Sequence, residues 1–225
     1  MTIQKAAVVG AGNMGSGIAQ KIATEGFNVI LADMNEEQAR KGVKRIETLL
    51  MEGVERKIFK PEQVETILGR ISATGDMNDL NDVDIIIEAV FEDIGIKQSL
   101  FQKLGEITRP DTVLATNTSS FLVAQVAEGV QHPERVIGLH YFYHPAKNRL
   151  VEVIGHEATS ESVLADAWNF QERIGKTPID SADAPGFVVN RFFVPWLNEA
   201  IRLKEEGHSI ASIEAASKQC FGVGM

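Results

Sequence analysis

The most constraining feature of this 225-residue sequence is a glycine-rich turn close to its start. Residues 10–15 read Gly-Ala-Gly-Asn-Met-Gly, which has the spacing G-x-G-x-x-G. An apolar run at residues 5–10 predicts a buried strand before the turn, and a helical pattern follows it. Asp33 ends the next predicted strand, 18 residues after Gly15. Such a turn alone is a weak signal, but this order of strand, turn, helix, strand and acidic residue strongly favours a dinucleotide-binding fold.

Each residue of the turn has a physical role. Gly10 permits the tight bend, Gly12 leaves room for a diphosphate to approach the backbone, and Gly15 lets the helix pack closely on the strand. The helix begins at Asn13 and Met14, where free backbone N–H groups and the helix dipole attract a negative charge. We therefore predict that these five residues bind the diphosphate of a cofactor.

Asp33 predicts which cofactor is bound. A carboxylate at this position accepts hydrogen bonds from ribose hydroxyls and repels a 2′-phosphate. The next four residues contain no arginine that would reverse this preference, and Arg40 is the nearest basic side chain. The sequence therefore favours NAD over NADP. The alternative interpretation is that Asp33 only caps the end of its strand.

The rest of the chain continues to alternate between strands and helices. The further predicted strands are residues 71–74, 83–89, 113–116, 136–142 and 150–154. The further predicted helices are residues 36–52, 61–69, 94–107 and 162–174. Apolar strands separated by helices indicate an α/β fold, namely a Rossmann-like, doubly wound and mostly parallel sheet. The two helices within residues 36–69 form a helical-hairpin insert in it.

The alternating pattern stops at residues 183–186, Asp-Ala-Pro-Gly, which we interpret as a domain boundary. Residues 1–183 form the predicted dinucleotide-binding domain, and residues 184–225 form the first part of an all-helical domain. Its first helix, residues 187–206, is apolar nearly all the way round and should be buried on most sides. We therefore expect that the chain is truncated or that a partner chain covers this helix.

Composition excludes several classes of protein. Hydrophobic residues at 44% and charged residues at 24% exclude a disordered chain. The sequence shows no signal peptide and no apolar run long enough to span a membrane. A single cysteine, Cys220, favours a reducing compartment, so we predict a cytoplasmic protein. The net charge of −9 argues against binding to nucleic acid or to a membrane surface.

The charge is nevertheless uneven. Residues 40–60 contain seven basic and three acidic side chains, a local charge of +4. One interpretation is a solvated helix face with pairs of opposite charge four residues apart. The other is a positive surface for an anionic ligand, and the segment alone leaves both open.

Four motifs carry the remaining chemical signal. They are residues 117–120 (Asn-Thr-Ser-Ser), 140–145 (His-Tyr-Phe-Tyr-His-Pro), 150–154 (Leu-Val-Glu-Val-Ile) and 183–191 (Asp-Ala-Pro-Gly-Phe-Val-Val-Asn-Arg). Ser119 and His140 follow the carboxyl ends of predicted strands, where ligands of open α/β sheets bind. Glu152 lies inside an apolar strand, where an unpaired carboxylate is costly. A His140–Glu152 pair would remove that cost and provide a general base. His140 and His144 lack further ligands that would make a metal site.

In order and spacing these motifs resemble the L-3-hydroxyacyl-CoA dehydrogenase family, which includes 3-hydroxybutyryl-CoA dehydrogenases. The resemblance extends over essentially the whole chain. It implies an NAD-binding domain followed by a helical domain that forms a homodimer. It also implies NAD-dependent oxidation of the 3-hydroxyl group of an acyl-CoA in fatty-acid metabolism.

The resemblance assigns roles to individual residues. His140 corresponds to the base that takes the hydroxyl proton, and Glu152 to its partner. Ser119 and Asn190 correspond to residues that hold the reacting oxygen, with Ser119 also near the cofactor. Glu92 and Lys97 correspond to cofactor contacts, and the basic insert corresponds to the CoA-binding arm. The sequence departs from the family's H-F-F-N-P at Tyr143 and His144, which stand in place of the asparagine and proline.

Two alternatives remain at this stage. One is a related hydroxy-acid dehydrogenase that acts on a substrate without CoA. The other is a non-catalytic NAD-binding fragment, because the helical domain is incomplete.

Overall fold

A computed structural model describes residues 2–223. The chain divides into two compact units between Ala184 and Pro185, and each unit is described by itself. Among the described residues, no helix is both long enough and apolar enough to cross a membrane.

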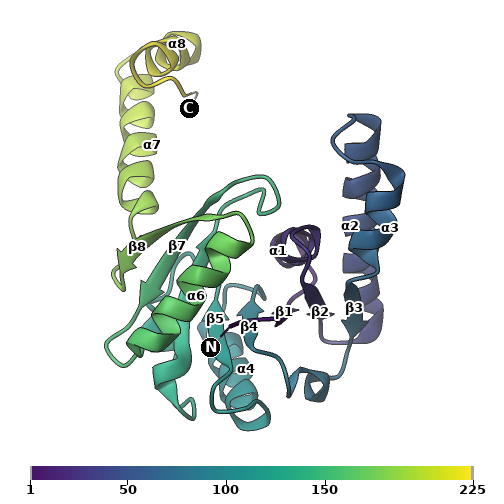
Figure 1. Ribbon diagram of the computed structural model, residues 1–225. Coiled ribbons are helices and arrows are strands. Elements are labelled where there is room, and N and C mark those ends of the chain that lie inside the picture. Colours follow the sequence, from purple (N-terminus) through teal and green to yellow (C-terminus); the bar gives the residue numbers. More distant parts are fainter. Residues whose placement is uncertain (1, 224–225) are drawn as a thin grey trace. The chain divides into compact units, whose positions relative to one another are not determined.

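The first unit is built around an eight-stranded sheet (Figure 1). Its strands are β1 (Lys5–Val9), β2 (Asn28–Ala32), β3 (Ile71–Thr74), β4 (Ile85–Glu88), β5 (Val113–Thr116), β6 (Val136–Tyr141), β7 (Leu150–Gly155) and β8 (Thr177–Ala182). The spatial order is β3-β2-β1-β4-β5-β6-β7-β8. Every neighbouring pair is parallel except β6 and β7, which are antiparallel. The predicted α/β class with a mostly parallel sheet is confirmed.

Helices pack on the sheet and bury its apolar strands. They are α1 (Asn13–Thr24), α4 (Ile94–Ile107), α5 (Val123–Val126) and α6 (Glu161–Arg173), with short 3₁₀ turns at Met77–Leu80 and Pro133–Arg135. One continuous core joins α1 and α6 to the strands through side chains such as Ile18, Ile22 and Phe170. Phe170 also meets Phe27 edge-on, with ring centroids 5.5 Å apart. The helices therefore bury one face of the strands from β2 to β7.

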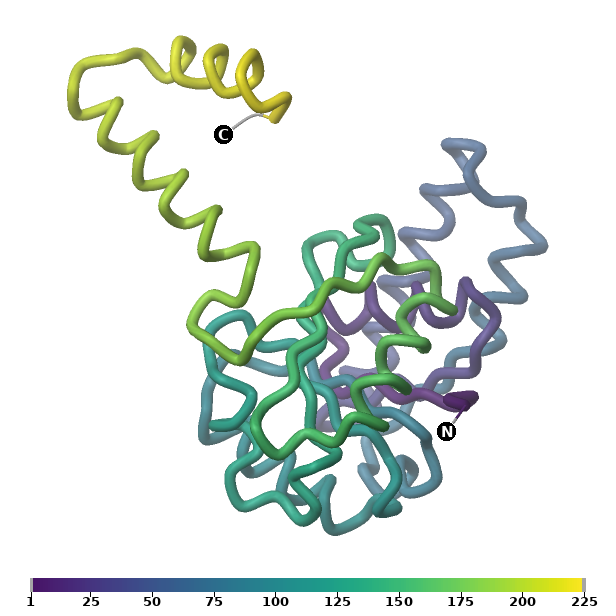
Figure 2. The backbone as a smooth tube through the Cα atoms, turned by 60° about the vertical axis from the view of Figure 1, so that its left-hand side comes forward, coloured from purple at the N-terminus to yellow at the C-terminus, as the bar shows by residue number. Residues whose placement is uncertain are grey.

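The insert between β2 and β3 is a helical hairpin. Helix α2 (Glu36–Glu55) and helix α3 (Pro61–Leu68) lie side by side and extend from the sheet, as the blue part of the tube in Figure 2 shows. Asn35 caps α2 by accepting a hydrogen bond from the backbone of Gln38 at 3.0 Å. Pro61 occupies the start of α3, where its missing N–H group costs nothing. The predicted helical insert is confirmed.

Strand β8 is the one strand that the sequence patterns do not predict. It contains Pro178, which cannot donate a hydrogen bond to a neighbouring strand. A proline is tolerated there because β8 is the last strand in the sheet order. The edge position, which only the assembled sheet reveals, therefore explains the difference.

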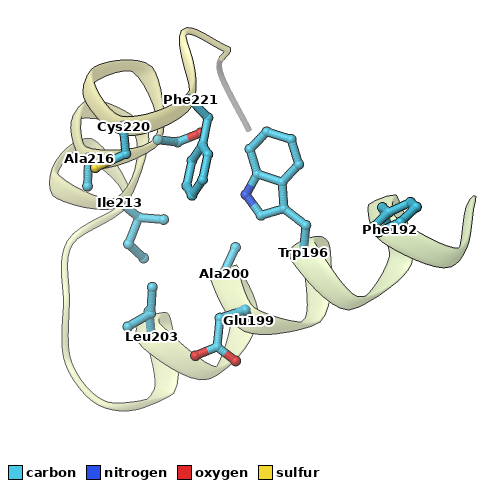
Figure 3. A pocket seen from close by; sticks show the side chains of 10 residues that line it. Phe192, Trp196, Glu199, Ala200, Leu203, Ile213, Ala216, Cys220 and Phe221 are labelled. Carbon is cyan, nitrogen blue, oxygen red and sulfur yellow. The ribbon is translucent and has the colours of Figure 1, made fainter. Parts of the chain in front are cut away.

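The second unit contains α7 (Val189–Glu205) and α8 (Ile210–Phe221), which pack against each other (Figure 3). Trp196 of α7 faces Phe221 of α8, with ring centroids 5.7 Å apart. The apolar lining between the helices includes Leu203 and Ile213. No residue of α7 is buried, and Phe192 is 75% exposed. The extensive burial expected for this helix is therefore absent from the chain as described.

Candidate active site

The glycine-rich turn lies between β1 and α1, and its three glycines differ in what surrounds them. A Cβ atom added to Gly15 would lie 1.7 Å from the carbonyl oxygen of Gly10. Gly10 itself has a φ of +102° and would meet the carbonyl oxygen of Ala89 at 2.5 Å. A Cβ added to Gly12 meets no protein atom within 4 Å. Gly10 and Gly15 are thus required by the fold. Gly12 instead leaves open space beside the amino end of α1, as the binding of a diphosphate requires.

This difference gives a testable prediction. Gly12→Ala should leave the free energy of unfolding within about 1 kcal/mol, because its backbone is extended and its Cβ has room. The same change should weaken NADH binding at least tenfold, since the methyl group enters the diphosphate space. Gly15→Ala should destabilise the protein by about 3 kcal/mol or more through overpacking. Fluorescence titration with NADH and urea unfolding measure the two effects, and unchanged NADH affinity in Gly12→Ala would contradict the assignment.

Asp33 lies directly beyond β2, next to the turn. Its Oδ2 atom accepts a hydrogen bond from the backbone N–H of Ala11 at 2.6 Å, and Oδ1 accepts one from Met34 at 2.7 Å. The carboxylate therefore fixes the glycine-rich turn from the neighbouring strand end. Asp33 therefore caps backbone N–H groups at the end of its strand, as the alternative interpretation expects. The contact of Asp33 with a ribose stays a prediction.

His140 and Glu152 face each other across the antiparallel strands β6 and β7, where they are register partners. The Nδ1 atom of His140 lies 2.5 Å from Oε2 of Glu152. The Glu152 side chain is fully buried and the His140 side chain is 8% exposed. An ionised carboxylate can only accept, so Nδ1 donates, and Nε2 carries the lone pair of the neutral ring. This arrangement can take up a proton at Nε2 and stabilise the resulting imidazolium.

Glu92 organises the loop that carries Ser119. Its Oε1 atom accepts hydrogen bonds from the Thr118 hydroxyl at 2.6 Å and from the backbone N–H groups of Ser119 and Ser120 at 2.9 and 3.1 Å. Burial raises the pKa of Glu92, but the Thr118 hydrogen bond and the ammonium of Lys97 outweigh it, so the pKa lies below its usual range. The lowered pKa favours the ionised form of Glu92. Its carboxylate fixes the backbone of Ser119, whose side chain is exposed.

Lys97 is buried between two carboxylates. Its ammonium contacts Glu88 at 2.7 Å and Glu92 at 3.0 Å, and its side chain is 1% exposed. Glu88, at the end of β4, also accepts from the Thr116 hydroxyl and the Val90 backbone. The predicted cofactor contacts of Glu92 and Lys97 stay predictions, whereas their part in a buried ion network is a structural finding. Glu88 was not predicted from the sequence, although it ends the apolar run Ile85–Ile87, where a carboxylate needs a partner.

Three long-range hydrogen bonds, one to Asn117 and two to Asp183, join the Ser119 loop and the start of α5 to their surroundings. The amide oxygen of Asn117 accepts from the backbone N–H of Tyr141 at 2.9 Å, which ties the loop to the residue after His140. Asp183 accepts from the N–H groups of Val123 and Ala124 at 2.7 and 2.9 Å, at the start of α5. Neither role has a local sequence signal, because the partners are 24 and about 60 residues apart.

Most basic side chains of residues 40–60 are engaged with neighbours. Four form ion pairs with glutamates three or four residues away, namely Arg40–Glu36, Lys41–Glu37, Lys44–Glu47 and Arg56–Glu52. Arg45 instead donates to the carbonyl oxygen of Ala11 at 2.7 Å, so it supports the glycine-rich turn. Within residues 2–223, Lys57 and Lys60 make no ion pair. The structure therefore contains the paired helix face and also two cations near the tip of the arm.

Asn190, Tyr143 and His144 are the remaining residues that the sequence singled out. Asn190 lies in the first turn of α7 in the second unit, and its role stays a prediction. Tyr143 is 73% exposed, and its ring lies 4.8 Å from that of His144. In the described part of the chain, no three His, Cys, Asp or Glu side chains converge as metal ligands do.

Comparison with known proteins identifies the family. Residues 5–184 match the family model of the 3-hydroxyacyl-CoA dehydrogenase NAD-binding domain, and residues 186–225 match that of the C-terminal domain. The chain belongs to the 3-hydroxyacyl-CoA dehydrogenase family. Membership of this dehydrogenase family makes it an NAD-dependent oxidoreductase with a Rossmann-type domain, as the sequence motifs predicted.

Individual members of the 3-hydroxyacyl-CoA dehydrogenase family agree in sequence and structure. A probable 3-hydroxybutyryl-CoA dehydrogenase of Bacillus subtilis is 40% identical over 207 residues, which cover 92% of this chain and 72% of that protein. The crystal structure of Mycobacterium tuberculosis FadB2 matches with a TM-score of 0.96 at 36% identity, covering 99% of this chain and 79% of that one. A Ralstonia eutropha (S)-3-hydroxybutyryl-CoA dehydrogenase has a TM-score of 0.92 at 32% identity, covering 96% and 77%.

Proposed function

We propose that the chain catalyses the reversible oxidation of the 3-hydroxyl group of a 3-hydroxyacyl-CoA to a ketone. The observation that carries this proposal is the His140–Glu152 pair, whose side chains face each other across β6 and β7 in a chain that has the NAD-binding domain of the family. Oxidation of an alcohol releases its hydroxyl proton, and a positioned general base that accepts this proton accelerates the reaction. The Nε2 atom of His140 is the proposed base. NAD, when bound, supplies the hydride acceptor that the oxidation requires.

The buried Glu152 fixes the tautomer of His140 and stabilises the imidazolium after proton transfer. Ser119 and Asn190 are proposed to hold the substrate oxygen, and the Glu92 carboxylate supports this by fixing the Ser119 backbone. The residues proposed to hold NAD are those of the glycine-rich turn together with Asp33. Gly12 supports this assignment, because the space beside it is free of protein atoms.

The helical arm is proposed to bind the CoA part of the substrate. Lys57 and Lys60 are the candidate ligands for its phosphate groups, because the other basic side chains of the arm are paired or support the turn. A phosphate group attracts an unpaired ammonium more strongly than one already neutralised by a carboxylate. We therefore infer that the tip of the arm, rather than its whole length, provides the affinity.

A comparison of two substrates tests the proposed function. With NADH as reductant, we expect acetoacetyl-CoA to be reduced with a kcat/KM at least 100-fold above that of free acetoacetate. The double variant Lys57→Met/Lys60→Met should raise the KM for acetoacetyl-CoA severalfold and leave acetoacetate unaffected. The fall in NADH absorbance at 340 nm reports both rates.

Preference for free acetoacetate would favour a hydroxy-acid dehydrogenase that does not use CoA. NADH binding without turnover of any acyl-CoA would favour a non-catalytic fragment. As a matched control, Lys44→Met removes a basic side chain that is already paired with Glu47 and should change neither KM.

We also propose that the protein is cytoplasmic and forms a homodimer through its helical unit. The cytoplasmic assignment rests on the single cysteine, Cys220. The dimer proposal is supported by exposed apolar side chains of α7, among them Phe192 at 75% and Ile201 at 57%.

A further inference from the structure

Lys176 is a buried cation that the proposed reaction does not use. It follows α6 and precedes β8, and it is 4% exposed. Its side-chain nitrogen donates to the carbonyl oxygens of Pro145 and Asn148, the latter at 2.7 Å. The same nitrogen lies over the ring of Tyr141, 5.2 Å from its centroid. A lysine is almost never buried without such partners, because removing an ammonium from water is costly.

The two carbonyl groups belong to one loop, residues 142–149, which connects β6 to β7. The loop therefore joins the strand of His140 to the strand of Glu152. Lys147 and Asn148 both donate from their backbone to the carbonyl oxygen of His144, at 2.9 and 2.8 Å, which folds the loop into a turn. Lys176 donates to the carbonyl oxygens of two residues of this turn, Pro145 and Asn148, and so fixes its conformation.

The loop also touches the catalytic pair and the cofactor-binding helix. Phe142, its first residue, places its ring 4.6 Å from the ring of His140. On the other side, the buried Pro145 packs against Gly17 of α1, where an added Cβ would lie 3.0 Å from the proline ring. The contact with α1 anchors the loop at Pro145, so a shift of the rest of the loop would move the Phe142 ring relative to that of His140.

We propose that Lys176 is a positioning residue that holds loop 142–149 so that Phe142 keeps His140 in its reactive orientation. This inference rests on the proposed function, because it assigns the catalytic role to His140. Lys176 acts through the loop, and it needs no contact with substrate or cofactor.

The protonation state of Lys176 agrees with this role. Burial, together with a smaller effect of the nearby Lys21 ammonium, lowers the pKa of Lys176 to about 8. At neutral pH the protonated form still predominates, so the side chain provides charge-assisted donors to both carbonyls. Lys21 itself is paired with Glu25 at 2.6 Å and does not contact the loop through any described hydrogen bond.

Lys176→Met tests the proposal, because methionine fills a similar volume and donates no hydrogen bond. We expect kcat for acetoacetyl-CoA reduction to fall about tenfold, while the Kd for NADH stays within twofold of the parent. Hydrogen–deuterium exchange should rise selectively in the peptide that covers residues 142–149. Lys176→Gln, which retains donors without a charge, should give an intermediate kcat and serves if the methionine variant does not fold. Lys21→Met removes a neighbouring lysine and should leave kcat and loop exchange unchanged.

Two results would overturn the proposal. One is a folded Lys176 variant with unchanged kcat. The other is a loss of activity that only follows the folded fraction, with exchange rising throughout the sheet, because that outcome indicates a purely structural role. If the parent enzyme reduces no acyl-CoA, the proposed function fails, whereas exchange in residues 142–149 still reports whether Lys176 holds the loop.

Discussion

His140→Gln is expected to lower kcat for acetoacetyl-CoA reduction by about 10²–10⁴-fold, the usual contribution of a positioned general acid or base. Glutamine cannot exchange a proton at the place of the Nε2 atom. Its amide can still donate to the buried Glu152, so the carboxylate keeps a partner and the strands β6 and β7 stay paired. The Kd for NADH should therefore remain within about twofold, because His140 supplies none of the proposed NAD-binding groups.

The matched control is His132→Gln. His132 is also hydrogen-bonded to a glutamate, with Nδ1 3.1 Å from Glu134, but its side chain is 52% exposed and lies in a turn. Stopped-flow or steady-state rates should be the same for this variant and the parent. Equal turnover in His140→Gln and the parent would refute the assignment of His140 as the base, whereas a parallel loss of NADH affinity would indicate a structural change instead.

The fold was predictable from sequence wherever a pattern is local. The glycine-rich turn, the apolar runs of β1 and β4 and the periodicity of α2 each depend on neighbouring residues, and the structure has these elements. Strand β8 was not predictable, because Pro178 and the polar Asp180 are tolerated only at the edge of an assembled sheet. The expected burial of α7 differs for a related reason. A helix pattern indicates that a face needs cover, and it does not indicate what covers it.

The candidate site shows the same division. Pairing of His140 with Glu152 could be predicted because a lone carboxylate in an apolar strand needs a partner, and the antiparallel register supplies it. The supports of the site were not predictable, because Asn117, Asp183 and Lys176 bond to backbone groups far away in the chain. Every residue has backbone groups, so the amino-acid types of the partner segment do not indicate that a contact forms there.

The buried ion network of Lys97, Glu88 and Glu92 is expected to contribute strongly to the stability of the protein. Lys97→Met should lower the free energy of unfolding by about 3–5 kcal/mol, because it leaves the fully buried Glu88 carboxylate without its cation. The hydrogen bonds from Thr116 and Val90 remain, but they do not neutralise the charge. Because Glu92 loses the same partner, the Ser119 loop should also become more mobile.

Urea unfolding of Lys97→Met, Glu88→Gln and the double variant measures the coupling within this network. The double variant should be more stable than the sum of the two single losses predicts, because it removes the buried charge together with its partner. Lys44→Met breaks an exposed pair with Glu47 and should change the free energy of unfolding by about 0.5 kcal/mol at most. Strict additivity of the two single losses would show that Lys97 and Glu88 do not act as a pair.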